Sequence, residues 1–135
     1  HGKKLKFTNM VTDSIADLLT RIRNAQKAKK ENTNCRYSKI KHEICKIMVK
    51  HGFLSKVDVV EDDKKELLIT LNYARPNLTL KRVSSPGQRI YKKHTEFKPV
   101  KAGLGIEIIS TSKGLMPQYK AFKSQLGGEV ICKIY

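Results

Sequence analysis

The residues best suited to chemistry form one short segment, Ser110-Thr111-Ser112-Lys113-Gly114. Three successive hydroxyls and a glycine offer short donors and acceptors together with accessible backbone N–H groups, and the lysine adds a positive charge. Groups of this kind suit phosphate oxygens, ribose hydroxyls and base edges. The same residue types also form ordinary polar turns, so the segment alone leaves both interpretations open.

The histidines and cysteines do not form a reactive cluster. No histidine has a partner at the spacing of a metal site or a catalytic triad. The number of cysteines is odd, and Cys45 and Cys132 lie among Ile and Val, where a free thiol packs like a small apolar group. Free thiols are typical of a reducing compartment. We therefore expect a protein that is not an enzyme and has no metal and no cofactor.

The chain is strongly cationic. It has 135 residues, with 28 Lys and Arg against 12 Asp and Glu, a formal net charge of +16. The hydrophobic content of 39% is too high for a disordered basic tail and sufficient for a modest core. No apolar stretch has the length of a membrane span, and no secretion signal opens the chain. This balance favours nucleic acid as the partner and argues against a membrane.

The charge is unevenly distributed along the chain. Residues 76–135 contain 11 basic and only 3 acidic residues, whereas five acids fall within residues 58–66. Because a polyanion repels carboxylates, we expect the acidic segment to face away from it and residues 76–135 to approach it most closely.

A first helix is predicted over residues 13–29. Its apolar residues recur with the period of one helix face at Ile15, Leu18, Leu19 and Ile22. Thr12 or Asp13 would cap the amide end, where backbone N–H groups can also meet a phosphate. Basic residues crowd the far end and the connection that follows it, among them Lys29 and Lys30, and we expect them to act as an electrostatic clamp.

The rest of the first half predicts one more helix and three extended segments. Residues 31–37 suit an extended piece, and Ser38 would cap a second helix that ends near Gly52. Alternating apolar residues over 53–59 and 67–71, joined by a polar turn, predict an antiparallel hairpin. The N-terminal module is thus αβαββ.

After Tyr73, Pro and Gly residues divide the chain into short pieces. The predicted strands are residues 78–83, 88–92, 104–110 and 130–134, and Pro117 opens one or two helical turns. This second module is mostly β with one short helix.

The expected fold class is therefore α+β with two small modules. The predicted organisation is a basic N-terminal extension at residues 1–9, an N-terminal α/β module at 10–75 and a C-terminal β-rich, RNA-reading module at 76–135.

Several collinear segments resemble the family of small-subunit ribosomal protein eight, in its bacterial and organellar form. The family's C-terminal signature is matched by residues 103–132, GLGIEIISTSKGLMPQYKAFKSQLGGEVIC, and its opening by residues 12–25, TDSIADLLTRIRNA. Residues 38–41, 52–53 and 82–91 match between them in the same order. The resemblance covers residues 10–135.

The resemblance implies a two-module α/β protein that binds an irregular stem in the central domain of small-subunit ribosomal RNA and supports subunit assembly and translation. It also implies a place in the ribosome of a bacterial cytoplasm or of an organelle (mitochondrion or plastid). Neighbouring small-subunit proteins, notably the fifth, are the implied protein partners, and no homo-oligomer is expected. The alternative function is autogenous repression through a similar stem in the protein's own mRNA.

The resemblance also assigns roles to residues. The segment from Ser110 to Gly114 matches the family's loop in the RNA minor groove, and Tyr91, after the Pro86-Gly87 turn, matches an aromatic that packs on the nucleic acid. The other matching residues are Arg89, Gly127, Gly128, Glu129, Lys39 and Lys41. Tyr91 alone would equally suit a core or edge-strand position, and Glu129 could instead hold the Gly-Gly turn.

One segment departs from the family pattern. Pro117-Gln118-Tyr119 and Ala121-Phe122 stand where the family usually has a more charged helix. Tyr119 and Phe122 either change how this helix meets RNA or indicate that a protein neighbour covers it.

Overall fold

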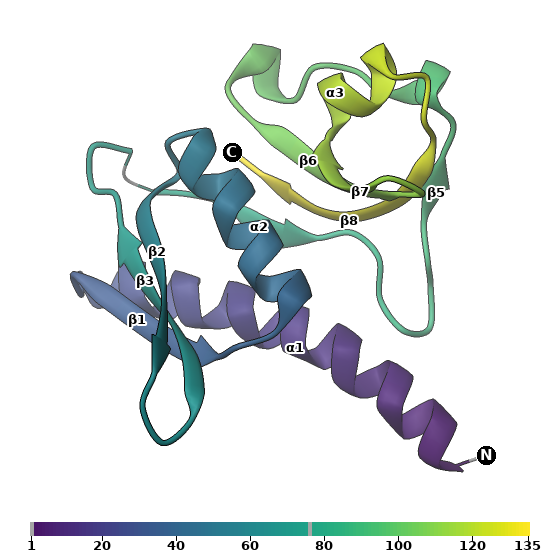
Figure 1. Ribbon diagram of the computed structural model, residues 1–135. Coiled ribbons are helices and arrows are strands. Elements are labelled where there is room, and N and C mark those ends of the chain that lie inside the picture. The colour runs from purple at the N-terminus through teal and green to yellow at the C-terminus, as the bar shows by residue number, and fades with distance from the viewer. Residues whose placement is uncertain (1, 76) are drawn as a thin grey trace. The chain divides into compact units, whose positions relative to one another are not determined.

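The computed structural model describes the backbone of residues 2–75 and 77–135 and the side chains of residues 14–75 and 77–135. The chain falls into two units, one comprising Asp13–Leu78 and the other containing Thr79–Tyr135 (Figure 1). The element order confirms the predicted α+β class, with αβαββ followed by a β-rich part with one short α-helix. The predicted module boundaries stay a prediction. No helix in the described part of the chain has the length and apolarity needed to cross a membrane.

The first helix, α1 (Gly2–Lys27), begins earlier than predicted. The preceding residues contain no proline and several good helix formers, so nothing stops the helix before Thr12. Thr12 and Asp13 therefore lie inside α1 and do not form its amide end, and the predicted cap is wrong. The predicted apolar stripe is confirmed, since its residues are at most 5% exposed: Ile15, Leu18, Leu19 and Ile22.

The end of α1 is closed by backbone hydrogen bonds rather than by a glycine. The Lys30 N–H donates to the Ala25 carbonyl at 2.9 Å and the Lys29 N–H to the Gln26 carbonyl at 3.1 Å. Lys29 has a φ of +57°, a left-handed conformation in which glycine is the usual residue. The exposed side chains of Lys29 and Lys30 therefore leave the helix from a fixed turn.

A three-stranded antiparallel sheet follows, in the order β1-β3-β2. Its strands are β1 (Asn32–Arg36), β2 (Leu54–Glu61) and β3 (Lys65–Leu71). The predicted hairpin is confirmed, with Val57 opposite Ile69 and Val59 opposite Leu67.

The second helix, α2 (Lys39–Lys50), has the predicted start and stop. The Ser38 Oγ accepts a hydrogen bond from the Lys41 N–H at 3.2 Å, as expected of an N-cap. After the helix, Gly52 has a φ of +78°, which confirms its predicted role at the C-terminal end.

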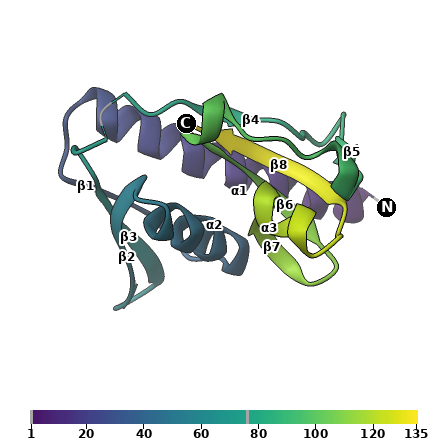
Figure 2. The same ribbon diagram turned by 90° about the horizontal axis from the view of Figure 1, so that it is seen from above.

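The second unit is built on an antiparallel sheet in the order β4-β8-β6-β7, with β5 also paired to β8. The strands are β4 (Leu80–Arg82), β5 (Tyr91–Lys92), β6 (Ile106–Thr111), β7 (Gly114–Pro117) and β8 (Gly128–Ile134). A short helix, α3 (Gln118–Lys123), follows Pro117, and two 3-10 turns cover His94–Glu96 and Lys101–Gly103. Figure 2 shows β8 in yellow between β4 and β6.

Strand β7 was not predicted, because its four residues include a proline and follow a polar segment. Its pairing with β6 makes the segment Ser110–Gly114 the tip of a hairpin rather than a free loop. Pro117 is buried at the end of this edge strand and leads directly into α3, as the N-cap rather than the first helical residue. One apolar cluster beneath α3 joins these elements through Phe97, Ile109, Ala121 and Val130.

A bulge in β8 changes which residues share a face of this sheet. Ile108 pairs with Cys132, but the next residue, Ile109, pairs with Val130, so Ile131 is an extra residue in β8. Side chains alternate along β6, which places Ser110 and Glu107 on opposite faces. Their partners, Glu129 and Lys133, lie on opposite faces as well.

Strand β8 can lie between its neighbours only because its first residue, Gly128, and the residue before it, Gly127, have no side chain. A Cβ on Gly128 would lie 2.9 Å from the carbonyl carbon of Ser110 and closer still to its oxygen. A Cβ on Gly127 would lie 2.7 Å from the carbonyl oxygen of Lys92. Both contacts are with backbone, which cannot move aside without breaking the sheet.

We expect Gly128→Ala to lower the free energy of unfolding by about 2–3 kcal/mol, because the added methyl group overpacks the β6–β8 contact. Urea denaturation would measure the loss. Gly87→Ala is the matched control, since a Cβ there meets nothing within 4 Å, and it should change stability by less than about 0.5 kcal/mol. Equal stability of the two variants would show that this close approach does not constrain the sheet.

The three cysteines are free and buried, which confirms the prediction that Cys45 and Cys132 pack as small apolar groups. Burial raises the pKa of the Cys45 thiol and of the Cys132 thiol, each to about 12. In the unfolded chain the thiol pKa is lower, so the folded state favours the protonated form. The resulting contribution to stability is present below the unfolded pKa and is lost as the pH rises through the folded pKa.

The free energy of unfolding should therefore fall as the pH is raised from about 9 towards 12, with both buried thiols contributing to the slope. Urea unfolding of the wild type and of Cys45→Ala/Cys132→Ala over the accessible part of this range tests it. The variant should be less stable near pH 9 but should lose less stability as the pH rises, because it lacks both buried thiols. Lysine ionisation is common to both proteins and does not distinguish them. If the unfolding free energies of the two proteins changed with pH in parallel, the raised pKa values of the buried thiols would be contradicted.

Candidate nucleic-acid interface

Three predicted site residues from distant parts of the sequence lie in one row across the C-terminal sheet. Tyr91 on β5 pairs with Glu129 on β8, and Glu129 pairs with Ser110 on β6. Neighbouring strands are about 4.8 Å apart, so the row extends across about 10 Å. Side chains that pair across strands project from the same face, and the row therefore presents an aromatic ring, a carboxylate and a hydroxyl together.

Tyr91 is an edge-strand residue and not a core residue. Its side chain is 66% exposed, and β5 pairs only with β8 in the described sheet. An exposed tyrosine at a sheet edge presents a flat apolar surface that can pack on a base or a sugar. This position fits the role that the resemblance implies.

The tip of the β6–β7 hairpin is held by its own side chains. The Thr111 hydroxyl donates to the Gly114 carbonyl at 2.8 Å, and the Lys113 N–H donates to Thr111 Oγ1 at 3.1 Å. Gly114 has a φ of +110°, which an L side chain rarely adopts. Thr111 and Gly114 therefore shape the turn, and Ser112 and Lys113 are exposed at its end.

The three hydroxyls of this segment thus have different surroundings. The Thr111 hydroxyl already uses its hydrogen within the turn, whereas the hydroxyls of Ser110 and Ser112 form no hydrogen bond with another described residue. Ser110 belongs to the row with Glu129, and Ser112 projects from the tip. Thr111 therefore shapes the turn, while the hydroxyls of Ser110 and Ser112 are not used within it.

The carboxylate of Glu129 is held by an arginine from the preceding hairpin. The Arg89 Nη1 lies 3.6 Å from the Glu129 Oε1, whose side chain is only 16% exposed. Arg89 follows the Pro86-Gly87 turn, in which Ser85 and Gln88 exchange backbone hydrogen bonds of 3.0 and 3.1 Å. Pro86 and Gly87 are exposed and act through the geometry of this turn. Of the two alternatives for Glu129, the ion pair with Arg89 favours a carboxylate positioned within the row over one that only holds the Gly-Gly turn.

The predicted glycines of the site have a structural role. Gly127 and Gly128 let β8 pass close to the backbones of Lys92 and Ser110. They bring the partners of the row into register.

The predicted basic residues of the first unit divide into exposed and buried ones. The side chains of Lys29, Lys30 and Lys39 are exposed. Lys41 is only 4% exposed, on the same helix face as Ile44 and Cys45, so it is less accessible to a phosphate than Lys39, and its contact with RNA stays a prediction. The sequence pattern showed its charge but not that its aliphatic stem would pack beside the apolar face of α2.

Thr12 and Asp13 no longer have the predicted basis for phosphate binding, because they do not lie at a helix terminus. Their side chains lie outside those that the structure describes. Whether they contact RNA stays a prediction.

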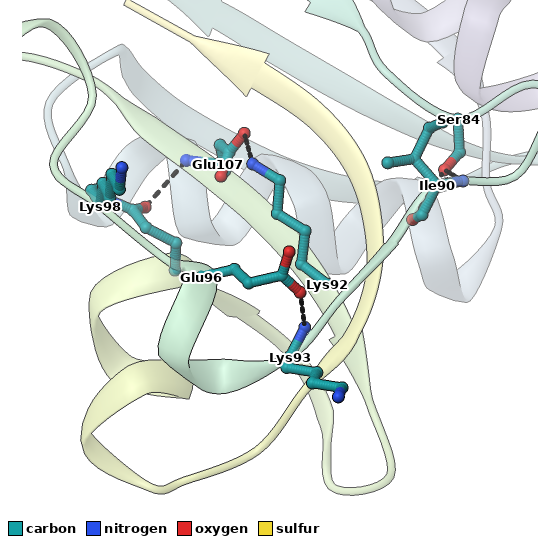
Figure 3. A network of polar contacts seen from close by, with 8 residues as sticks. Ser84, Ile90, Lys92, Lys93, Glu96, Lys98 and Glu107 are labelled. Atoms are coloured by element: carbon teal, nitrogen blue, oxygen red, sulfur yellow. Dashed lines mark hydrogen bonds and ion pairs between the residues drawn. The ribbon is translucent and has the colours of Figure 1, made fainter.

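The structure adds a group of residues that the sequence did not single out. Glu107 is buried in β6, and the Nζ of Lys92 lies 3.5 Å from its Oε2 (Figure 3). The signal in the sequence was an isolated carboxylate among Ile106, Ile108 and Ile109, which requires a partner when it is buried. In the described side chains, no group of three or more His, Cys, Asp or Glu residues could hold a metal ion.

The comparisons with known proteins agree with one another. The family model of ribosomal protein S8 matches residues 13–135. The small ribosomal subunit protein uS8 of Caldanaerobacter subterraneus subsp. tengcongensis is 49% identical over 132 residues, which cover 93% of this chain and 99% of the relative. The corresponding proteins of Gracilaria tenuistipitata (uS8c) and Clostridioides difficile are 45% and 42% identical over 93% of this chain, and over 100% and 98% of their own lengths. The matches extend over both units, and the chain belongs to the ribosomal protein S8 family.

Proposed function

We propose that this chain is a non-enzymatic, structural component of the small ribosomal subunit, and that it binds an irregular stem in the central domain of the subunit's RNA. The observation that carries the proposal is the row Tyr91–Glu129–Ser110 beside the hairpin tip at Ser112. Family membership and the printed names of the relatives support the place in the small subunit. The net charge of +16 supports RNA as the partner.

The row suits the minor groove of an A-form stem. That groove is wide and shallow and displays ribose hydroxyls and base edges. Short serine hydroxyls can approach these groups closely, and the tyrosine ring can pack where the stem is distorted and a base is unstacked. Glu129, positioned by Arg89, can accept a hydrogen bond from a base amino group. A carboxylate that faced a phosphate would instead be repelled by its negative charge.

The exposed lysines of the first unit supply affinity without sequence preference. Lys29, Lys30 and Lys39 are solvated ammonium groups, and each phosphate contact releases counterions and adds to salt dependence. Neighbouring ribosomal proteins, the fifth of the small subunit among them, are proposed partners on the strength of the resemblance alone.

Titration with a stem RNA of about 40 nucleotides, beside a fully paired control duplex, tests the assignment of roles. We expect Ser110→Ala/Ser112→Ala to weaken binding of the irregular stem by at least about tenfold and to leave the duplex unaffected, because only base and sugar contacts are lost. The matched control is Ser55→Ala/Ser124→Ala, which removes two exposed hydroxyls elsewhere.

In the same titration, Lys29→Gln/Lys30→Gln should weaken the binding of both RNAs by similar factors. It should also reduce the slope of log affinity against log salt concentration by about 1.5. Binding of stem and duplex with equal affinity by the wild type would contradict the proposed function. Loss of stem binding in the control serine variant would contradict the assignment of the site.

A further inference from the structure

Besides the row Tyr91–Glu129–Ser110, the C-terminal unit has a cavity of about 360 Å³ that is lined mainly by charged residues. Five lysines contribute to its lining: Lys81, Lys92, Lys98, Lys101 and Lys133. Two carboxylates, Glu96 and Glu107, and the ring of Tyr135 are also part of it. The proposed stem-binding row includes none of these residues.

The cavity opens on the opposite face of the sheet from that row. Lys133 pairs with Glu107 on one side and with Lys81 on the other, so these three side chains form a second row. The bulge at Ile131 places this row on the face away from Ser110 and Glu129. Lys92 likewise follows Tyr91 along β5 and projects to the other side. A single stem docked on the first row therefore cannot reach the cavity through the sheet.

The two carboxylates of the cavity are already engaged. Glu107 Oε2 lies 3.5 Å from Lys92 Nζ, and Glu96 Oε1 accepts a hydrogen bond from the Lys93 N–H at 2.7 Å (Figure 3). The other four lysines form no ion pair with a carboxylate in the described part of the chain. The cavity thus has an excess of positive charge that its own acids do not neutralise.

The ring of Tyr135 lies close to the ammonium groups of two of these lysines. The Nζ of Lys101 lies 4.7 Å from the centre of the Tyr135 ring and that of Lys81 lies 5.8 Å from it. The hydrogen bond with Lys81 also lowers the pKa of the Tyr135 hydroxyl, and the charges of Lys101 and Lys133 act in the same direction. Both ammonium groups thus lie within reach of the same ring, which attracts cations.

We infer that this cavity binds the phosphate backbone of a second RNA segment, on the face of the sheet opposite the stem. The inference rests on the proposed function, because it takes RNA as the partner. Lysine-rich, polar surfaces are typical of interfaces with nucleic acid, whereas the centre of a protein–protein interface is depleted in lysine and glutamate. Val100 and Pro99 are the only aliphatic side chains in the described lining, too little for an apolar protein contact.

The test compares two RNAs: the irregular stem alone, and a longer central-domain RNA that contains the stem and its neighbouring segments. Binding of the full chain is measured for Lys101→Gln/Lys133→Gln and, in case that change disturbs β8, for Lys81→Gln/Lys98→Gln. The matched control is Lys56→Gln/Lys64→Gln, which removes the same charge from the acidic hairpin of the first unit. Thermal unfolding confirms that each variant is folded.

We expect either cavity variant to weaken binding of the longer RNA about tenfold and to change stem binding no more than the control does. Lysine acetylation read by mass spectrometry should show the cavity lysines protected by the longer RNA and not by the stem. Inorganic phosphate and a polyglutamate peptide serve as further probes in the same assay.

Three outcomes would overturn the inference: equal effects of cavity and control variants on the longer RNA, protection of the cavity by the stem alone, or protection by phosphate or by the acidic peptide but not by the longer RNA. Failure of the proposed function is a different result, because there the wild type would no longer distinguish the irregular stem from the paired duplex.

Discussion

The close passage of two glycines beside neighbouring backbones determines the geometry of the C-terminal unit. Gly127 and Gly128 admit β8 between β5 and β6, and β8 also pairs with β4. Without that approach, Tyr91, Glu129 and Ser110 would have no common register. Their side chains contribute little to this arrangement, so the proposed recognition surface depends mainly on backbone packing that only glycine permits.

The bulge in β8 determines on which face of the sheet the charged side chains of this strand lie. A regular strand would place Lys133 on the same face as Glu129, because the two residues are four positions apart. The extra residue, Ile131, moves them to opposite faces and lets Val130 join the apolar cluster beneath α3. One face then presents hydroxyl, carboxylate and aromatic groups, and the other presents a concentration of lysines. A single insertion in the ladder thus separates a surface suited to selectivity from one suited to affinity.

The sequence predicted the fold where local patterns determine it. The apolar period of α1, the Ser38 cap and the hairpin of the first unit depend on neighbouring residues, and all three were confirmed. Strand β7 and the start of α1 were missed, because one depends on pairing with β6 and the other on the absence of a stop signal. The pairing of Tyr91 with Glu129 and the burial of Lys41 depend on distant segments, which no local pattern contains.

In the proposed mode of RNA binding, affinity and selectivity depend on different kinds of residue, and they should respond differently to mutation. A solvated lysine contributes through its charge, its position is adjustable, and neighbouring lysines can compensate for its loss. The serine hydroxyls contribute only if the turn that Thr111 and Gly114 shape is held in place. On this proposal, substitutions that impair selectivity fall into two classes: those at Ser110 and Ser112 should leave the fold intact, and those at Gly127 and Gly128 should change the backbone. Because the second class also lowers stability, binding selectivity and unfolding free energy must be measured together before a residue is assigned to recognition.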